Sequence, residues 1–190
     1  MSSYDMKKIV LLSRKSFLAK IQTHIAKIEI NKIKKNLIDI HYSSSVGDKD
    51  LSAKAWEQHG FGIFTNSLSK KLVLKEADVV VHSYKDLPVK NLNKTSFVCL
   101  RRDDPRDIIL IKRSSLNKKK LVIGTSSPRR KYYLKKLKEF LPYQGLKSIQ
   151  IRGNVPSRLE KVLNTSKEDG LFMAKAAIDR ICLLYTSPSP

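Results

Sequence analysis

The sequence predicts an α/β protein whose sheets are mainly parallel, and two observations support this prediction. Short apolar runs typical of buried strands alternate along the chain with segments whose apolar residues recur at helical spacing. Several of these runs end in a polar, charged turn that leads into a helix or loop, as repeated strand–helix units require. We therefore expect two α/β lobes, with helices on the faces of their sheets, flanking a cleft.

The first lobe is expected to span residues 1–103. Its predicted elements, in chain order, are a strand at Lys8–Ser13, a helix at Ser16–Asn31, a strand at Leu37–Tyr42, a helix at Thr65–Lys75, and strands at Asp78–Ser83 and near Phe97–Leu100. The first helix carries Leu18, Ile21, Ile25 and Ile28 on one face. Residues at this spacing form an apolar stripe, so we expect this face to pack on the sheet.

A break in the pattern separates the two lobes. The run Asp103-Asp104-Pro105-Arg106-Asp107 combines a proline with several charges, which is typical of a crossing point between domains. The second lobe, residues 104–183, is expected to contain strands at Ile108–Ile111, Leu121–Thr125, Ser148–Ile151 and Leu171–Met173, with helices around Arg129 and Arg158. Residues 184–190 end in alternating Ser and Pro, which disfavours helix, so we expect a disordered or non-native tail there.

Composition limits the classes of partner. The 190 residues are 41% hydrophobic, enough for a core, and 38 basic against 17 acidic residues give a formal net charge of +21. Such an excess indicates an anionic partner: a nucleic acid, a membrane surface or an acidic small molecule. The lysines are scattered, as Lys118-Lys119-Lys120 shows, and we interpret them as solvated surface. The arginines gather in or beside polar turns, where their planar forks suit carboxylates or phosphates.

The most informative segment is Gly124-Thr125-Ser126-Ser127-Pro128-Arg129-Arg130, which follows the strand-like run Leu121-Val122-Ile123. Ser127 is a good N-cap, and Pro128 suits the first position of a helix. Free N–H groups at such a helix start, with two guanidiniums beside them, form a site for anions. An ordinary capped surface helix is the alternative interpretation.

Three more charged turns follow apolar runs. They are Arg14-Lys15-Ser16, His82-Ser83-Tyr84-Lys85-Asp86-Leu87-Pro88 and Arg152-Gly153-Asn154-Val155-Pro156-Ser157-Arg158. Open α/β sheets bind ligands at the carboxyl ends of their strands, so all four turns can face one crevice. In this order and spacing the segments resemble the porphobilinogen deaminase family, from about Lys8 to about Leu183. The most specific patterns are H-S-x-K-D-x-P, D-D-P-R-D, G-T-S-S-x-R-R and R-G-N-V-x-x-R.

The family is also called hydroxymethylbilane synthase and acts in tetrapyrrole (haem) biosynthesis. The resemblance implies two periplasmic-binding-protein-like (type II) lobes and an enzyme that polymerises porphobilinogen, with loss of ammonia, into a linear tetrapyrrole. Asp86, beside Lys85, would stabilise the cationic pyrrole formed as ammonia leaves and would assist proton transfer. A surface Lys–Asp pair in a turn is the alternative at these two positions. The resemblance also implies a dipyrromethane cofactor, and we expect a monomer.

Each pyrrole carries an acetate and a propionate, so every added ring brings two more carboxylates that repel those already bound. The resemblance implies that arginines, with further polar donors, hold these groups. The implied substrate- and cofactor-binding residues are Arg14, Ser16, Ser83, Thr125, Ser127, Arg129, Arg130, Arg152, Gly153, Asn154, Arg158 and Arg180. We interpret His82 as a structural hydrogen-bonding residue rather than a general base, and we expect no metal site.

The sequence departs from the family pattern in two places. The segment Gly60–Ser67 keeps two glycines and Phe64 but lacks the lysines and glutamate usual in the family, which puts loop closure or cofactor anchoring there in doubt. In the family the cofactor is attached by a thioether to a cysteine in a third domain, and neither Cys99 nor Cys182 lies in a matching context. We therefore expect a truncated or chimaeric gene product that is inactive by itself.

Two other classes of function stay open. A non-catalytic anion-binding module with the same two lobes would keep the arginines but would not need the pair Lys85 and Asp86. A nucleic-acid-binding protein fits the net charge, but it predicts aromatic residues interleaved with basic ones, and aromatics are only 7% of the chain. We therefore expect no nucleic-acid partner.

The expected location is the cytoplasm, and an organelle is the alternative. The chain has two isolated cysteines, of which Cys99 is interpreted as buried, and this usage fits a reducing compartment. No apolar run has the length of a membrane span, so we expect no membrane partner. The first strand begins too early to leave room for a signal peptide.

Overall fold

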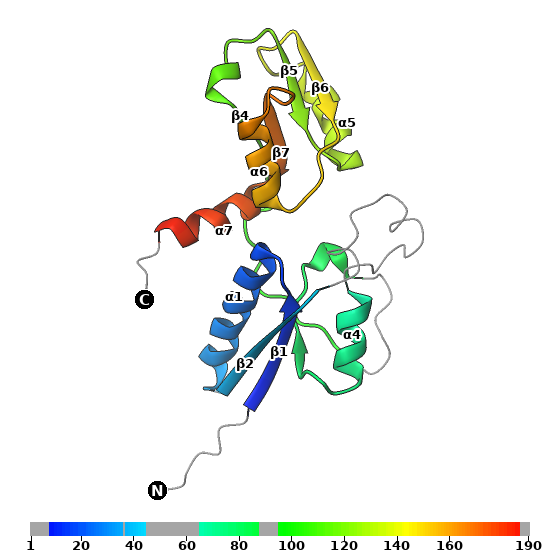
Figure 1. The fold of residues 1–190 in the computed structure, drawn as a ribbon, viewed down its shortest axis with the longest axis vertical. Helices are drawn as coiled ribbons and strands as arrows, with labels where there is room; N and C mark the ends of the chain where they lie inside the picture. The colour runs from blue at the N-terminus through cyan, green and yellow to red at the C-terminus, as the bar shows by residue number, and fades with distance from the viewer. Residues whose placement is uncertain (1–7, 36, 45–64, 88–94, 187–190) are drawn as a thin grey trace, which may run out of the picture. The chain divides into compact units, whose positions relative to one another are not determined.

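The computed structural model describes residues 8–35, 37–44, 65–87 and 95–186, and the chain divides into two compact units. The N-terminal unit is Met1–Arg101 and the C-terminal unit is Arg102–Pro190 (Figure 1). The boundary that we expect from the sequence, after residue 103, lies close to this division. Each unit has its own sheet and its own apolar core.

The sheet of the N-terminal unit consists of three parallel strands in the order β2-β1-β3. Its described elements are β1 (Lys8–Arg14), α1 (Phe17–Ile33), β2 (Leu37–Ser43), α4 (Asn66–Val73) and β3 (Val79–Val80). β1 is the central strand and pairs with β2 along its whole length. Only Val79 and Val80 of the expected strand Asp78–Ser83 form a strand.

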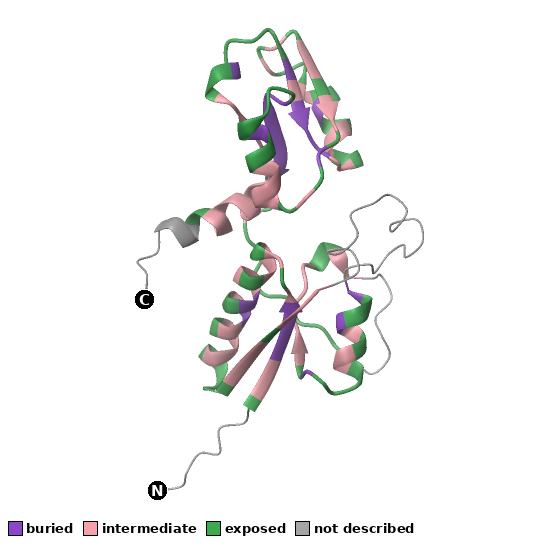
Figure 2. Ribbon diagram, viewed as in Figure 1, coloured by how far each residue is buried: buried purple, intermediate pink, exposed green. Residues whose placement is uncertain are grey.

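The two helices α1 and α4 cover opposite faces of this sheet (Figures 1 and 2). Side chains alternate between the faces along a strand, and this alternation sorts the contacts of β1. Leu12 packs with Leu68 of α4 and with Ala77. The hydroxyl of the next residue, Ser13, lies 3.4 Å from the carbonyl oxygen of Ala19 in α1. The N-terminal unit is therefore a three-layer sandwich with β1 in its centre.

α1 buries a different set of residues from the one that the sequence predicts. Thr23 and Ala26 are buried, whereas Ile28 is 56% exposed. The Thr23 hydroxyl donates a 2.8 Å hydrogen bond to the carbonyl oxygen of Ala19, so its burial leaves no unpaired polar atom. Our expectation that Ile28 packs on the sheet is wrong because small residues occupy the buried side of the helix.

The C-terminal unit has a four-stranded sheet in the order β4-β7-β5-β6. Its main elements are β4 (Asp107–Ile111), β5 (Lys120–Gly124), α5 (Pro128–Leu137), β6 (Gly145–Ile149), α6 (Val155–Asn164), β7 (Gly170–Ala174) and α7 (Lys175–Thr186). β5 is parallel to β6 and β7, and β4 is antiparallel to β7. The prediction of an α/β protein with mainly parallel strands is thus confirmed, with β4 as the exception.

Two apolar clusters cover the two faces of this second sheet (Figure 2). The cluster on the α5 side contains Leu121, Ile123, Leu134 and Phe172. The cluster on the α6 side contains Ile151, Val162, Leu171 and Met173. Because successive residues of β7 contribute to opposite clusters, this strand is buried on both faces, as expected for a central strand of an α/β sheet.

Three expected features are wrong. Phe97–Leu100 forms no strand, and Cys99 in it is exposed, not buried, because no partner strand covers this segment in the described part of the unit. β6 is Gly145–Ile149 rather than Ser148–Ile151, since its pairing with β5 begins at Gly145. α7 continues through Thr186 into the tail expected at 184–190, because the first proline of that tail comes only at Pro188.

The altered segment Gly60–Ser67 lies outside the described residues except for its last three, which begin α4 with Thr65 at the N-cap. Among the helices that the structure describes, none is both long and apolar enough to cross a bilayer.

Gly170 provides a test of the pairing between β4 and β7. A Cβ atom at this position would lie 2.3 Å from the carbonyl oxygen of Leu110, and this oxygen cannot move aside because it belongs to a paired strand. Gly170→Ala is therefore expected to lower the free energy of unfolding of the C-terminal unit by about 1–3 kcal/mol, the usual cost of overpacking. Urea unfolding followed by circular dichroism measures this change.

Gly145→Ala is the matched control. A Cβ atom there would contact only the flexible side chain of Lys120, at 3.2 Å, so the unfolding free energy should change by less than about 0.5 kcal/mol. Equal stabilities of the two variants would contradict the register between β4 and β7.

Candidate functional site

The N-terminal unit places a carboxylate between two cations where β1 and β3 end. Arg14 is the last residue of β1, and its Nη1 lies 3.8 Å from Oδ2 of Asp86. Lys85 Nζ lies 3.7 Å from Oδ1 of the same carboxylate. The side chain of Asp86 is 16% exposed, whereas that of Lys85 is 82% exposed. Asp86 is thus largely removed from water and keeps opposite charges on both sides.

The chain builds this site with a single turn. β1 and β3 are adjacent and parallel, so their carboxyl ends lie at one edge of the sheet. After β3 the residues Tyr84–Asp86 form a 3₁₀ turn, in which the Asp86 amide donates to the carbonyl oxygen of Ser83 at 2.9 Å. This turn returns the Asp86 carboxylate toward Arg14. Sequence adjacency alone could not place the two together, since they are far apart in the chain.

The two predicted serines of this unit differ in their partners. The Ser83 hydroxyl donates a 3.1 Å hydrogen bond to Oε1 of Gln22 in α1, which ties the turn to the helix. Ser16 occupies the N-cap of α1, but its side chain makes no capping hydrogen bond. Its hydroxyl is therefore not used by its own helix. Gln22 was missed in the sequence because a polar residue on a helix carries no sign of its tertiary partner.

At one ring nitrogen, His82 lacks the hydrogen bond that its interpretation as a structural hydrogen-bonding residue predicts. Its Nε2 is buried, and no hydrogen-bond partner for it lies in the described structure. Burial lowers the pKa of His82 to about 4; the charge of Asp86 raises it in part, and that of Arg14 lowers it further. The imidazole is therefore neutral at pH 7, next to the Arg14–Asp86 pair.

In the C-terminal unit one carboxylate holds two of the predicted arginines. Oδ1 of Asp107 accepts hydrogen bonds from Nε and Nη2 of Arg130, at 3.2 and 2.9 Å. Oδ2 of Asp107 lies 2.6 Å from Nη2 of Arg129. Burial raises the pKa of Asp107, but the hydrogen bonds and charges of the two arginines outweigh this effect, so the pKa lies below its ordinary value. Asp107 therefore carries its charge at neutral pH.

The antiparallel strand β4 explains why these groups meet. The parallel strands β5, β6 and β7 end at the same edge of the sheet. β4 runs the opposite way, so its first residue, Asp107, pairs with Ala174, the last residue of β7. Asp107 thus reaches the edge from which α5 starts with Arg129 and Arg130. In the sequence, Asp107 is recognisable only as part of the connection between the two lobes, because the residues of a strand do not reveal its direction.

Two helices begin at this edge, and both are capped by a side chain; the cap at Ser127 is the one that the sequence predicts. Ser127 accepts a 3.4 Å hydrogen bond from the Arg130 amide at the start of α5. Asn154 accepts one of 2.9 Å from the Ser157 amide at the start of α6. Gly153 precedes this second cap with a φ of +116°, which only glycine adopts readily. The structure therefore places two positive helix ends beside the arginines.

Arg158 of α6 belongs to the same cationic group. Its Nε donates a 2.7 Å hydrogen bond to the carbonyl oxygen of Gly153, which fixes the side chain across the start of its own helix. Burial and the charge of nearby Arg130 lower the pKa of Arg158 from its usual value. A guanidinium keeps its proton far above neutral pH, so both arginines stay charged. Arg130 and Arg158 are therefore two cations that repel each other in a site partly shielded from water.

The remaining predicted residues of this unit take other positions. Thr125 is buried, and its hydroxyl accepts from the Ser127 amide at 3.3 Å, so it shapes the turn. Arg180 lies on α7, where its Nε donates to Asp103 at 2.9 Å. Arg152 is exposed next to the amide of Gln150. The structure thus groups Arg129, Arg130 and Arg158 at one edge and gives Arg180 an acidic partner of its own.

One lysine of the run is exposed, as interpreted from the sequence, but also has a specific acidic partner. Lys118, interpreted as solvated together with Lys119 and Lys120, lies 2.6 Å from a carboxylate oxygen of Asp169, a residue that is 5% exposed. Asp169 also accepts from the Ser115 hydroxyl and the Val122 amide. Lys118 therefore completes a buried polar network at the edge where β5 begins.

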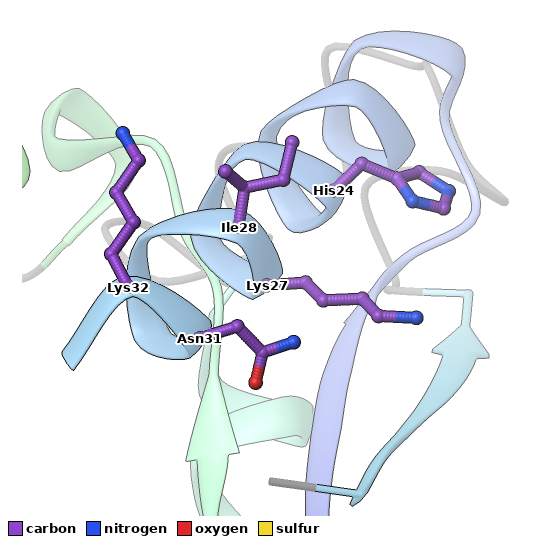
Figure 3. A pocket seen from close by; sticks show the side chains of 5 residues that line it. All are labelled: His24, Lys27, Ile28, Asn31 and Lys32. Carbon is purple, nitrogen blue, oxygen red and sulfur yellow. The ribbon is translucent and has the colours of Figure 1, made fainter. Parts of the chain in front are cut away.

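A hollow on α1 does not coincide with either group of site residues. Figure 3 shows that it is lined by His24, Lys27, Ile28, Asn31 and Lys32, all from this helix. None of the predicted site residues borders it. The hollow is a feature of the helix surface.

Comparison with known proteins supplies the family. Residues 9–187 match the family described as "Porphobilinogen deaminase, dipyromethane cofactor binding domain". The chain belongs to the porphobilinogen deaminase family. It is 36% identical over 180 residues to porphobilinogen deaminase of Ruminiclostridium josui and 38% identical over 173 residues to probable porphobilinogen deaminase of Picrophilus torridus. With porphobilinogen deaminase of Coxiella burnetii (strain Dugway 5J108-111) it shares 36% identity over 182 residues.

These porphobilinogen deaminases are longer than the chain. The matches cover 94%, 89% and 93% of this chain but 59%, 58% and 57% of the respective relatives. The family match also extends to residue 187, past the point after which we expect a tail. The dipyrromethane-binding character of the family agrees with the cofactor that the sequence motifs imply.

The state of His82 can be tested directly. Because its folded pKa is about 4, below the value of 6.5 for a free histidine, the unfolded chain binds the proton more readily. The contribution of His82 to stability is therefore complete above about pH 6.5 and is lost as the pH falls through about 4. Imidazole ¹⁵N chemical shifts, assigned with a His82→Gln variant, should show a neutral ring at pH 7 and a midpoint below about 5. A midpoint above about 6 would contradict the burial of Nε2.

Proposed function

We propose that this chain is the cofactor- and substrate-binding part of a hydroxymethylbilane synthase, which polymerises porphobilinogen with loss of ammonia into a linear tetrapyrrole. The proposal rests above all on Asp86, a largely buried carboxylate held between Arg14 and Lys85 in a chain of this family. The aspartate is preorganised for a developing positive charge. An anion-binding module without catalysis would have no need for such a group.

Asp86 would act on the reacting pyrrole. When the C–N bond of porphobilinogen breaks, its electron pair leaves with the nitrogen and positive charge spreads over the pyrrole. A fixed carboxylate stabilises this cation more than it stabilises the neutral substrate, which lowers the barrier. After the new carbon–carbon bond has formed, the attacked ring must lose a proton, and the same carboxylate can assist this transfer. Lys85, which is exposed, would bind or protonate groups on the solvent side.

The arginines would hold the carboxylates of the pyrroles. Arg129, Arg130 and Arg158 lie at one edge of the C-terminal sheet with the starts of α5 and α6. Guanidiniums and helix N-termini bind carboxylates through paired N–H groups. Arg14, Ser16 and Ser83 would supply donors in the N-terminal unit, and Thr125, Ser127, Arg152, Gly153, Asn154 and Arg180 complete the proposed binding set.

The residues of this edge also suit a dipyrromethane. Such a group carries several carboxylates, and the donor set at this edge is cationic and rich in N–H groups. When bound, it supplies the pyrrole carbon to which substrate is joined. Cys99 and Cys182 are both exposed, and neither lies in a context like that of the family's attachment cysteine. We propose that neither carries the thioether, so the intact masses of Cys99→Ser and Cys182→Ser should show the same adduct, or the same lack of one, as the unchanged protein.

The finer architecture belongs to the same proposal. We infer two periplasmic-binding-protein-like lobes, residues 1–103 and 104–183, that face a common cleft, in a cytoplasmic monomer. The proposal is supported by the position of each cationic group at the edge of its sheet where parallel strands end.

Three substitutions separate the roles of the charges in the full-length protein, meaning this chain completed by the third domain of the family. Asp86→Asn keeps the shape of the side chain but removes the anion, so porphobilinogen turnover should fall by about 10²–10³-fold while the protein stays folded. Arg130→Ala removes one bidentate donor and should weaken porphobilinogen binding by about 1.5–3 kcal/mol. Turnover is followed by porphobilinogen consumption and binding by calorimetry.

Lys119→Ala is the control for diffuse charge. Lys119 is an exposed residue of the lysine run, and unlike Lys118 it is not the partner of Asp169. Its replacement should leave turnover and binding unchanged. If Lys119→Ala impaired binding as much as Arg130→Ala, general positive charge rather than a built site would be responsible, and the proposal would fail.

A further inference from the structure

We propose that Asp107 is a positioning residue that orients Arg129 and Arg130 for the carboxylates of the ligand. The inference rests on the proposed function, because it assigns Asp107 a task toward the ligand of the same site. The main observation is that the two carboxylate oxygens of Asp107 bind the guanidiniums of Arg129 and Arg130.

The geometry leaves part of each guanidinium for another anion. Arg130 contacts Asp107 through Nε and Nη2, which form one of the two edges that a guanidinium can offer to a carboxylate. Its Nη1 does not take part in this contact. Arg129 contacts Asp107 through Nη2. Asp107 thus fixes both arginines without covering all of their donors.

Ring contacts fix the two arginines further. The Arg130 guanidinium lies over the ring of Phe172, 6.0 Å from its centre, and its side chain is 17% exposed. The Arg129 guanidinium lies 5.9 Å from the ring centre of Tyr133, and its side chain is 59% exposed. Each guanidinium therefore has an aromatic ring on one side and Asp107 on another. An arginine restrained in this way loses less side-chain entropy when a ligand binds.

Asp107 also allows the cations to lie close together. Burial and, after it, the charge of nearby Arg130 lower the pKa of Arg158, and Arg129 adds a third positive charge beside Arg130. With its side chain only 12% exposed, Asp107 neutralises one of these charges from inside. The group keeps a positive balance for an anionic ligand, and the mutual repulsion is smaller than it would be for three bare guanidiniums.

The opposite role makes an opposite prediction. If Asp107 competed with the ligand for the arginines, its removal would free two cations and raise the net charge of the site by one. Porphobilinogen would then bind more tightly to Asp107→Asn. If Asp107 positions the arginines, the same substitution weakens binding although it makes the site more positive. The sign of the change therefore decides between the two roles.

The experiment measures porphobilinogen binding to the full-length protein by calorimetry. Asp107→Asn is expected to weaken binding by about 5-fold or more, and Asp107→Glu, which keeps the charge but moves it by one methylene group, should weaken it less. The control Asp39→Asn makes the same charge change at a partly exposed residue of β2 that forms ion pairs with Lys8 and His41, and it should not alter binding.

A second measurement separates an effect on the position of the arginines from a general loss of structure. In a variant with both Arg129→Ala and Arg130→Ala, adding Asp107→Asn should cause no further loss, because Asp107 acts through these arginines. The Nε–H NMR signal of Arg130 should also lose its hydrogen-bonded shift in Asp107→Asn. If Asp107→Asn does not fold, the inference is tested by comparing Asp107→Glu with the unchanged protein. Equal porphobilinogen binding by these two proteins would overturn the inference.

The outcomes separate the two proposals. If the double arginine variant binds porphobilinogen as well as the unchanged protein does, the proposed function fails. If the arginine variant loses binding but Asp107→Asn binds equally well or more tightly, the proposed function stands and the positioning role of Asp107 is wrong.

Discussion

The carboxyl ends of parallel strands meet at one edge of a sheet, and the functional chemistry of both units depends on this constraint. In the N-terminal unit it brings the end of β1 with Arg14 next to the turn after β3 with Asp86. In the C-terminal unit it brings the starts of α5 and α6 together, and β4 adds Asp107 because it runs in the opposite direction. Apolar clusters on both faces of the C-terminal sheet, and on the α4 side of the N-terminal sheet, hold these edges in place.

Paired charges are the second common feature of the two edges. Asp86 lies between Arg14 and Lys85, and Asp107 lies between Arg129 and Arg130. In each case one largely buried carboxylate forms ion pairs with two cations. The three groups together therefore carry a net positive charge. Partial burial strengthens these interactions and also makes an unpaired charge costly, so the pairs fix side chains that would otherwise be mobile. The proposed substrate, an anion that loses ammonia and passes through a cation, requires both signs of charge in fixed places.

Much of this arrangement is predictable from the sequence, and the failures have physical causes. Apolar runs and caps identify strands and helix starts, and Ser127 caps the helix that its motif indicates. The direction of β4 depends on tertiary pairing, and for this reason the role of Asp107 was missed. Lys118 resembles its neighbours in sequence, and only the fold reveals that it lies against the buried Asp169. Cys99 follows an apolar pair, but Phe97–Leu100 pairs with no described strand, so the residue is exposed.

The central claim is that carboxylate ligands bind to the ordered arginines at these sheet edges rather than to the scattered lysines of the surface. The most direct measurement is a titration of the ¹⁵N-labelled protein with porphobilinogen, followed by the Nε–H signals of the arginines and the Nζ signals of the lysines. We predict saturable shifts at Arg129, Arg130 and Arg158, with none at Lys118 or Lys119. Shifts that spread over the lysines and leave the three arginines unchanged would contradict the account.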